Sequence, residues 1–223
     1  MRSPYRVRTH FVLHWLFSGL LVLLTLPALA QEAGLPLSPA QEAWLRTHPT
    51  VTVGLYDNDW PPFERVRDGK AEGLAYDYLA EATTRLGVIL TVRRYPNWTE
   101  VLRAACAGEV DVVMDVALTA ERTRCMVFTR QYAEAPVALV TRLQDGRASR
   151  EPELTGLRVV TERDFALAAV ARERYPEATH LEANGTQAAL RMVSDGQADV
   201  YIGNAYVASA LIADADIARI GLL

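Results

Sequence analysis

A polar turn at residues 118–122 carries side chains that could bind a small molecule: the hydroxyl of Thr119, the carboxylate of Glu121 and the guanidinium of Arg122. The turn follows an apolar, β-branched run at residues 110–116, which is typical of a buried parallel strand. We therefore expect the turn to lie beyond the C-terminal end of a strand, where open α/β sheets place their ligands.

No pattern for catalysis or metal binding accompanies this turn. The sequence shows no nucleophile–base pair, no close carboxylate pair and no metal-ligand spacing, and His48 and His180 stand alone. We expect a protein that is not an enzyme and that holds no metal and no cofactor. Whether Cys106 and Cys125 form a disulfide stays open. An oxidising compartment permits the bond, whereas a helical position suits Cys106 as a core residue.

The helix–glycine–strand unit that leads to this turn occurs twice. Five residues recur 88 positions later: Leu102, Arg103, Gly108, Asp111 and Val112 match Leu190, Arg191, Gly196, Asp199 and Val200. The second copy ends in another polar turn, Gly203 and Asn204. The repeat favours two related α/β halves facing each other across a cleft over a chance similarity.

An aromatic loop follows the first predicted strand, residues 51–55. It contains Trp60, two prolines and Phe63. Prolines stiffen the loop, so its rings could form one wall of a ligand pocket. Packing of a rigid loop on its own domain is an equal alternative.

The remaining pattern predicts two lobes and their junction. We expect lobe 1 at residues 51–142, with residues 136–142 as the first strand that crosses between the lobes. The polar residues 144–152 then lead into lobe 2 at residues 143–223. In lobe 2, the predicted strands at 157–161, 179–181 and 198–202 alternate with helices, of which one spans 164–174 and the last 204–212.

Two segments precede lobe 1. Residues 1–30 combine three arginines, an apolar run and an Ala-Leu-Ala site, which predicts a cleaved export signal; an uncleaved membrane anchor is the alternative. Residues 31–50 form a preface in which Ser38 can cap a short helix, with Gln41 completing a capping box. Leu37, Trp44 and Leu45 could pack one side of this helix on the body. Whether the export signal is cleaved or stays as an anchor, we expect the body to lie outside the cytoplasm.

The composition is that of a mildly acidic globular protein. The 223 residues are 50% hydrophobic and 22% charged, with a formal net charge of −4. Removing the first 30 residues removes three arginines and no acids, which leaves −7. No basic tract suggests a nucleic-acid partner, and two cysteines exclude a disulfide-rich scaffold.

Several segments, in their order, resemble the family 3 periplasmic solute-binding proteins, which have the type 2 Venus-flytrap fold: DWPPFE, GLAYDYLAEAT, AGEVDVVMDVALTAER, FTRQY, LTGLRVV and GQADVYIGN. The preface LSPAQEAWLRTHP followed by VTVGLYDNDWPPF resembles, more particularly, the flytrap domains at the front of virulence-sensor-type hybrid histidine kinases. The resemblance runs from about Leu35 to the last residue.

The resemblance implies roles for individual residues. Arg122 falls where amino-acid-binding members place the arginine that holds the ligand's α-carboxylate, and a guanidinium fork pairs with a carboxylate through two parallel hydrogen bonds. A structural arginine bound to nearby carbonyls or to Glu121 is the alternative. Thr119 could add a contact. The implied apolar walls come from Trp60, Phe63 and Trp98.

Three positions depart from the family's pattern. Ala117 stands where many amino-acid binders have Ser or Thr, so one hydrogen bond to a carboxylate is lost. Asn204 stands where they have the Asp that pairs with the α-ammonium, and Asp164, in place of the usual Gly-Thr turn, suits an N-cap. The ligand should thus bear an anionic group, with an α-amino group optional.

The resemblance implies an α/β protein of two lobes that closes on a small carboxylate or amino-acid-like solute, as the sensor domain of a transmembrane histidine kinase in a two-component system. The alternatives are a free binding protein for an ABC permease and, less favoured, the regulatory domain of a lytic transglycosylase or a periplasmic dehydratase. In the family the chain returns to lobe 1, and we expect that return to be missing here. A homodimer is a further expected partner.

Overall fold

The structure, a computed structural model, describes residues 35–143, 153–214 and 217–223. The predicted export signal at residues 1–30 lies outside these ranges. Leu37–Leu223 forms one compact unit, which holds every helix and strand described below. Within the described ranges, no helix has both the length and the apolar character that a membrane crossing needs.

The preface helix α2 (Pro39–Thr47) begins as the sequence predicts. Ser38 and Gln41 form the capping box: the Ser38 hydroxyl accepts from the Gln41 N–H, and the Ser38 N–H donates to the Gln41 side chain. The expected packing of Trp44 on the body is wrong. Its side chain is 50% exposed and stacks on His48 with ring centroids 4.1 Å apart, because one helical turn places the two rings on the same face.

The first sheet is parallel, with strand order β4-β1-β5. Its strands are β1 (Thr50–Tyr56), β4 (Ile89–Tyr95) and β5 (Val112–Val113), and its helices are α3 (Leu74–Leu86) and α4 (Trp98–Cys106). Gly87 ends α3 in the left-handed conformation at φ 68°, as expected for a C-terminal glycine. A small hairpin of β2 (Arg65–Arg67) and β3 (Lys70–Glu72), absent from the expected elements, stands between the aromatic loop and α3.

The apolar run at residues 110–116 forms a much shorter strand than expected. Only Val112 and Val113 pair with β1. The backbone of Asp115 has φ 51°, so the extended conformation ends there. The extended segment therefore ends before the expected turn at residues 118–122.

The second sheet has the order β10-β6-β9-β7-β8. Strands β7 (Arg158–Glu162), β8 (Thr179–Ala183) and β9 (Val200–Asn204) are parallel, whereas β6 (Val137–Arg142) and β10 (Ile220–Leu222) are antiparallel to their neighbours. Helices α5 (Ala166–Arg174), α6 (Thr186–Ser194) and α7 (Ala205–Asp214) complete this half. The strand expected to cross between the lobes, β6, lies in this sheet, so the chain changes sheets before Val137.

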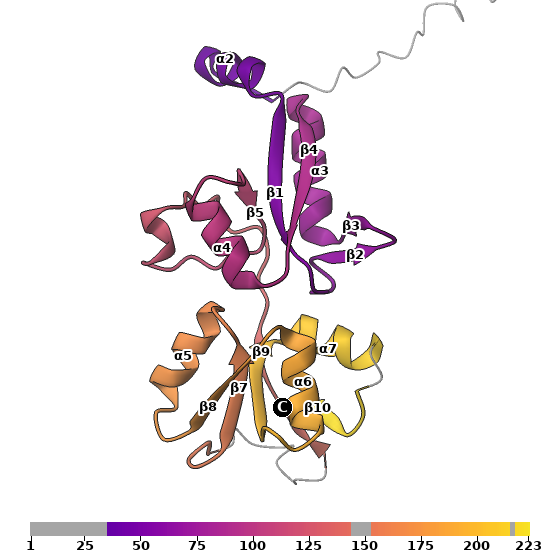
Figure 1. The fold of residues 1–223 in the computed structure, drawn as a ribbon, viewed down its shortest axis with the longest axis vertical. Helices are drawn as coiled ribbons and strands as arrows, with labels where there is room; N and C mark the ends of the chain where they lie inside the picture. The colour runs from indigo at the N-terminus through magenta and orange to yellow at the C-terminus, as the bar shows by residue number, and fades with distance from the viewer. Residues whose placement is uncertain (1–34, 144–152, 215–216) are drawn as a thin grey trace, which may run out of the picture. The chain divides into compact units, whose positions relative to one another are not determined.

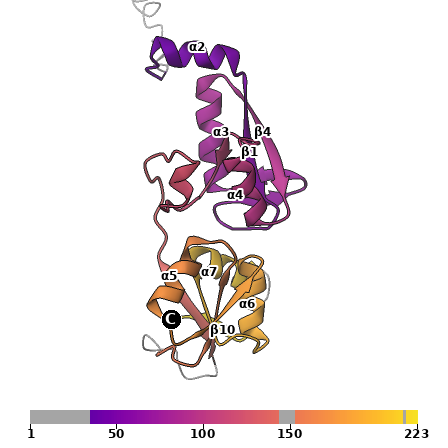
Figure 2. The same cartoon turned by 60° about the vertical axis from the view of Figure 1, so that its left-hand side comes forward.

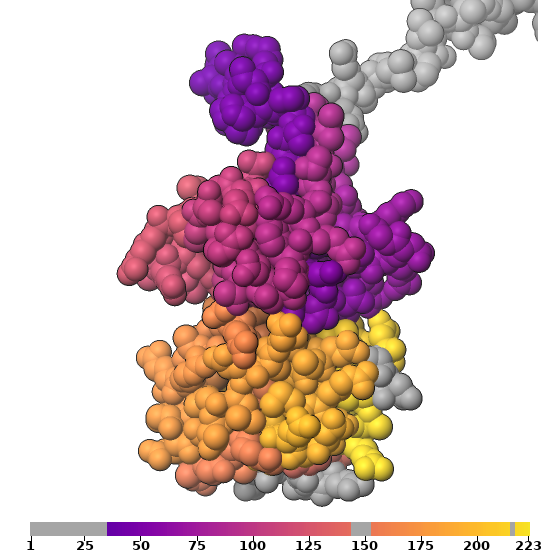
Figure 3. Space-filling view, viewed as in Figure 1, coloured from indigo at the N-terminus to yellow at the C-terminus, as the bar shows by residue number. Residues whose placement is uncertain are grey.

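Figures 1 and 2 show β1, β4 and β5 with α3 and α4 as one group of elements, and the second sheet with α5, α6 and α7 as another. On the face in Figure 3 the two groups meet in direct atomic contact. A single cluster of buried apolar side chains includes Leu55 from β1 and Tyr201 from β9. The α/β architecture with two sheets confirms the fold class expected from the sequence.

Candidate functional site

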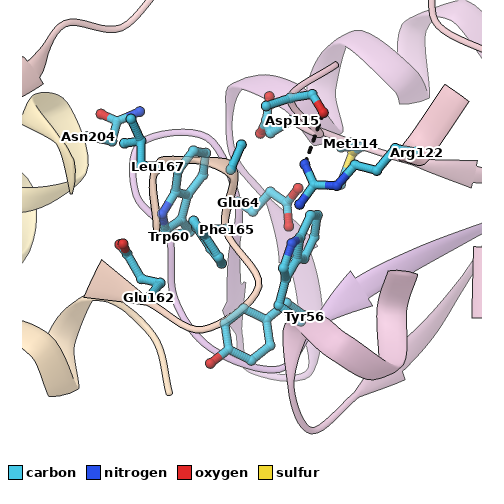
Figure 4. A pocket seen from close by; sticks show the side chains of 13 residues that line it. Tyr56, Trp60, Glu64, Met114, Asp115, Arg122, Glu162, Phe165, Leu167 and Asn204 are labelled. Carbon is cyan, nitrogen blue, oxygen red and sulfur yellow. Dashed lines mark hydrogen bonds between the residues drawn. The ribbon is translucent and has the colours of Figure 1, made fainter. Parts of the chain in front are cut away.

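A cavity of about 180 Å³ opens between the two sheets (Figure 4). Residues from both halves of the unit line it: Tyr56, Trp60, Glu64, Trp98, Met114, Asp115, Ala117, Arg122, Glu162, Phe165, Ala166, Leu167 and Asn204.

Parallel strands explain why these residues meet. Tyr56, Glu162 and Asn204 are the last residues of β1, β7 and β9. The carboxyl ends of parallel strands lie at one edge of a sheet, so the loops that follow them are gathered there. The two edges face each other across the cavity.

Arg122 begins η2 (Arg122–Arg124), and its residue is only 9% exposed. Its Nη1 donates to the Ala117 carbonyl at 2.9 Å, and its Nη2 donates to the Asp164 carbonyl at 2.7 Å. Asp164 follows β7, so this arginine links the two halves. Burial lowers its pKa from the usual value, against the nearby charges of Glu121 and Asp164.

The guanidinium of Arg122 has five N–H groups, and these two bonds use two of them. Arg122 is therefore bound to nearby carbonyls, as in the alternative considered from the sequence. It leaves donors on a side chain that lines the cavity.

Aromatic rings form the apolar wall. Phe165 lies between Trp98 and Trp60, with ring centroids 5.5 and 6.1 Å away. Phe63 is buried behind Trp60, at 5.2 Å, and does not line the cavity. Among the described residues, the buried Trp60 Nε1 has no hydrogen-bond acceptor.

Two carboxyl groups from the first half also line the cavity, and neither is among the residues expected at the site. Glu64 follows the aromatic loop and is 6% exposed. Asp115 follows β5, and its Oδ1 accepts from the Tyr132 hydroxyl. Burial raises the pKa of both, and the charge of Asp115 raises that of Glu64 further, well above its usual range.

A third carboxyl, Glu162, comes from the end of β7 and is 1% exposed. Its Oε1 accepts from the hydroxyls of Thr186 and Tyr201, each at 2.6 Å. Its buried Oε2 has no partner among the described residues. Burial raises the pKa of Glu162, and the two hydroxyl hydrogen bonds oppose that rise.

Of the residues expected at the site, Trp60, Trp98, Ala117, Arg122 and Asn204 line the cavity. Asn204 also caps α7, because its Oδ1 accepts from two backbone N–H groups of that helix.

Thr119 and Asp164 do not line the cavity, and both instead form hydrogen bonds with Arg122. The Thr119 hydroxyl accepts from the Arg122 backbone N–H, at 3.3 Å. Asp164 is not the expected N-cap of α5, since its φ is 61° and Phe165 occupies the cap position. Its carboxylate accepts from the Thr99 hydroxyl instead, and its carbonyl holds Arg122.

One signal in the sequence does point to Asp115. A carboxylate inside an apolar, β-branched run is costly to bury and so marks a special environment. Glu64 and Glu162 give no comparable signal, because their burial depends on elements distant in the chain.

A disulfide joins Cys106 to Cys125. It connects the C-terminal end of α4 to the residue that ends η2. The pairing left open by the sequence is therefore present, and it anchors the segment that carries Arg122.

The chain matches known proteins over most of its length. The family described as bacterial extracellular solute-binding proteins, family 3, matches residues 51–199. The virulence sensor protein BvgS of Bordetella bronchiseptica is 32% identical over 76% of this chain, and the sensor protein EvgS of Escherichia coli K12 is 25% identical over 80%. The chain spans only 14% and 15% of the length of these two relatives.

Solved structures have the same fold. The periplasmic VFT2 domain of Bordetella pertussis BvgS superposes with a TM-score of 0.73 at 26% identity, covering 84% of this chain and 80% of that one. The arginine-bound, truncated ArgBP of T. maritima reaches 0.68 at 21% identity, covering 81% and 84%, which shows the fold alone. With this fold, a cleft between two lobes and the match over residues 51–199, the chain belongs to the family 3 bacterial extracellular solute-binding proteins.

Proposed function

We propose that this chain binds a small carboxylate or amino-acid-like solute in the cavity between its two sheets, and that it does so as the periplasmic sensor domain of a transmembrane signalling protein. The observation that carries the binding proposal is Arg122. It is a buried guanidinium with unused donors on a cavity whose other wall is aromatic.

The geometry of Arg122 suits a carboxylate. Its two carbonyl bonds fix the plane of the guanidinium before any ligand arrives, and the Thr119 hydroxyl holds the Arg122 backbone N–H. A fork held in one orientation loses little side-chain entropy when it pairs with a planar anion. The unpartnered Trp60 Nε1 offers a further donor on the same cavity.

The sensor role is supported by the relatives, which are named as sensor proteins. Their greater length provides for domains beyond the portion that this chain matches. Ligand binding at the cavity would then be the input to an attached kinase.

The experiment is calorimetric titration of the full chain with a panel of small acids: amino acids, their des-amino analogues and dicarboxylates. We expect one-to-one binding of at least one acid. Arg122→Ala should weaken it by roughly ten- to hundred-fold, the equivalent of a lost charge-assisted hydrogen bond of about 1.5–3 kcal/mol.

Arg124→Ala is the matched control, since Arg124 lies in the same short helix with an exposed side chain. Binding that survives Arg122→Ala unchanged, or a panel with no binder, contradicts the proposal. In cells, deletion of the gene should change transcription in response to the ligand and leave its uptake intact; loss of uptake would instead favour the importer.

A further inference from the structure

Residues 117–131, here called the Arg122 segment, have little packing to fix them. Apart from the single turn of η2, the segment contains no helix or strand. Arg122 is its only buried residue, and none of its apolar side chains belongs to a cluster of the core. Leu118 is 68% exposed and Val127 is fully exposed. In Figure 1 the segment runs from β5 toward β6 beside α4, and hydrophobic packing contributes little to its position.

Hydrogen bonds hold the Arg122 segment mainly to itself. Among the described residues, one bond from the segment reaches a distant part of the chain, from Arg122 Nη2 to the Asp164 carbonyl. The others stay within the segment or end at Ala133, just beyond it. The hydrogen bonds therefore do not anchor the segment to the first sheet.

The disulfide supplies that anchor. Cys125 ends η2, and Cys106 is the last residue of α4. Helix α4 is firmly packed, because it buries Trp98, Val101 and Ala104 in the core. The disulfide thus joins a loosely packed segment to a rigid helix.

Helix α4 and Arg122 hold the same residue of the second half. Thr99, in the first turn of α4, donates from its hydroxyl to the Asp164 carboxylate, and Arg122 donates to the Asp164 carbonyl. Asp164 has a φ of 61°, a conformation that a residue other than glycine keeps only when its surroundings hold it. While the disulfide is closed, both contacts come from one connected body. When it is open, only the Thr99 contact remains attached to α4.

We propose that the Cys106–Cys125 disulfide is a redox modification site, reduced by a dithiol, whose state sets how firmly Arg122 is held in the cavity. Both cysteines are exposed residues, and exposed disulfides are the ones that exchange readily with thiols. The modification itself does not depend on the proposed function. Its effect on ligand affinity rests on that function.

The reaction is a thiol–disulfide exchange. A thiolate of the dithiol attacks one Sγ, the S–S bond breaks, and the other cysteine leaves as a thiolate. The second thiolate of the reductant then attacks the mixed disulfide and releases the first cysteine. The protein gains two electrons and, from the two thiols of the reductant, two protons, while the dithiol becomes a cyclic disulfide.

A dithiol fits this site better than a monothiol. The Cα atoms of the two cysteines lie 5.1 Å apart, so the freed cysteine stays next to the mixed disulfide. It can expel a monothiol and close the bond again. A dithiol completes the reduction with its own second sulfur before this happens.

Reduction should loosen the Arg122 segment without unfolding the chain. The segment then opens more often, because its loop is no longer closed on α4. Arg122 would have to be ordered again when an anion binds, and that ordering cost weakens the complex.

The experiment measures hydrogen–deuterium exchange of the full chain by mass spectrometry, with and without dithiothreitol, in the absence of denaturant and ligand. Maleimide labelling counts the free thiols. We expect two free thiols after reduction and exchange at residues 119–126 that is faster by roughly tenfold or more, with β7 and β9 unchanged. The Cys106→Ser, Cys125→Ser double variant should exchange like the reduced wild type and should not respond to dithiothreitol.

Three results overturn the inference: no labelling without denaturant, unchanged exchange at residues 119–126 in a reduced chain, or an equal rise throughout both halves. The last would make the disulfide a general support of stability. Equal reduction by 2-mercaptoethanol at the same thiol concentration overturns the assignment to a dithiol.

A second arm titrates the oxidised and reduced chain with glutamate and succinate by calorimetry. Reduction should weaken binding of an acid that binds by about threefold or more, and dithiothreitol should leave the double serine variant unaffected. Unchanged affinity in the reduced wild type overturns the effect on Arg122. If neither acid binds while exchange at residues 119–126 rises as expected, the proposed function fails for these acids and the modification site stands.

Discussion

Replacing Glu64 with glutamine should make the unliganded protein more stable at neutral pH, and the gain should grow as the pH rises. The Glu64 carboxyl is buried without a partner and beside Asp115, so its folded-state pKa lies well above the usual 4.5. The native protein therefore binds this proton more tightly than the unfolded chain. Glutamine keeps the size and polarity of the protonated acid and has no proton to lose.

The sign and size follow from proton linkage. Below pH 4.5 both the folded and the unfolded state hold the proton. The unfolding free energies of the wild type and of Glu64→Gln should therefore differ by a constant amount there. Between that pH and the raised folded-state pKa, the wild type loses about 1.4 kcal/mol of unfolding free energy per pH unit. For a domain of this length, that loss corresponds to roughly 3–6 °C in Tm per pH unit.

The assay is urea unfolding of wild type and Glu64→Gln, followed by circular dichroism from pH 4 to pH 8 without ligand. The exposed Glu173→Gln should give a curve parallel to the wild type. If the difference between wild type and Glu64→Gln stays constant over this range, Glu64 has an ordinary pKa, and the reasoning about its burial beside Asp115 is refuted.

Two further variants test how the site is held together. A Cβ at Gly185 would lie 2.2 Å from Asn58 Nδ2, so Gly185→Ala should weaken ligand binding more than tenfold by calorimetry; Gly87→Ala, also at positive φ but uncrowded, should lower only stability, by about 1 kcal/mol. Unchanged binding by Gly185→Ala would show that this contact between the halves is dispensable. Replacing Cys106 and Cys125 together with serine should lower the unfolding free energy by about 3 kcal/mol, as expected for a closed loop of this size, and urea unfolding of the wild type with reductant should reproduce the loss. Identical unfolding with and without reductant would contradict it.

The sequence predicts the regular elements well where local chemistry decides them. The capping box of α2 and the left-handed Gly87 after α3 are set by residues within one turn. The predictions fail where the backbone departs from its local preference. Asp164 adopts a left-handed conformation instead of capping α5, and Asp115 ends β5 inside an apolar run.

The residues of the site fall into the same two groups, those that the local sequence predicts and those that it does not. The predicted strands place Arg122, Trp60 and Asn204 near one cavity, because each of these residues lies at or beyond the end of a strand that the sequence indicates. The buried state of Glu64 depends on an unexpected hairpin and on packing against distant residues, such as the contact of Phe63 with Tyr206. The buried Glu162 carboxyl accepts hydrogen bonds from hydroxyls that lie 24 and 39 positions away in the chain.

The two kinds of charge in the cavity differ in how they are prepared for a ligand. Arg122 is oriented before binding, by two carbonyls, a hydroxyl and a disulfide three residues along the chain. Most of its ordering cost is met on folding, so it suits recognition of a planar anion. Glu64 and the free oxygens of Asp115 and Glu162 have no such preparation, and their burial lowers stability.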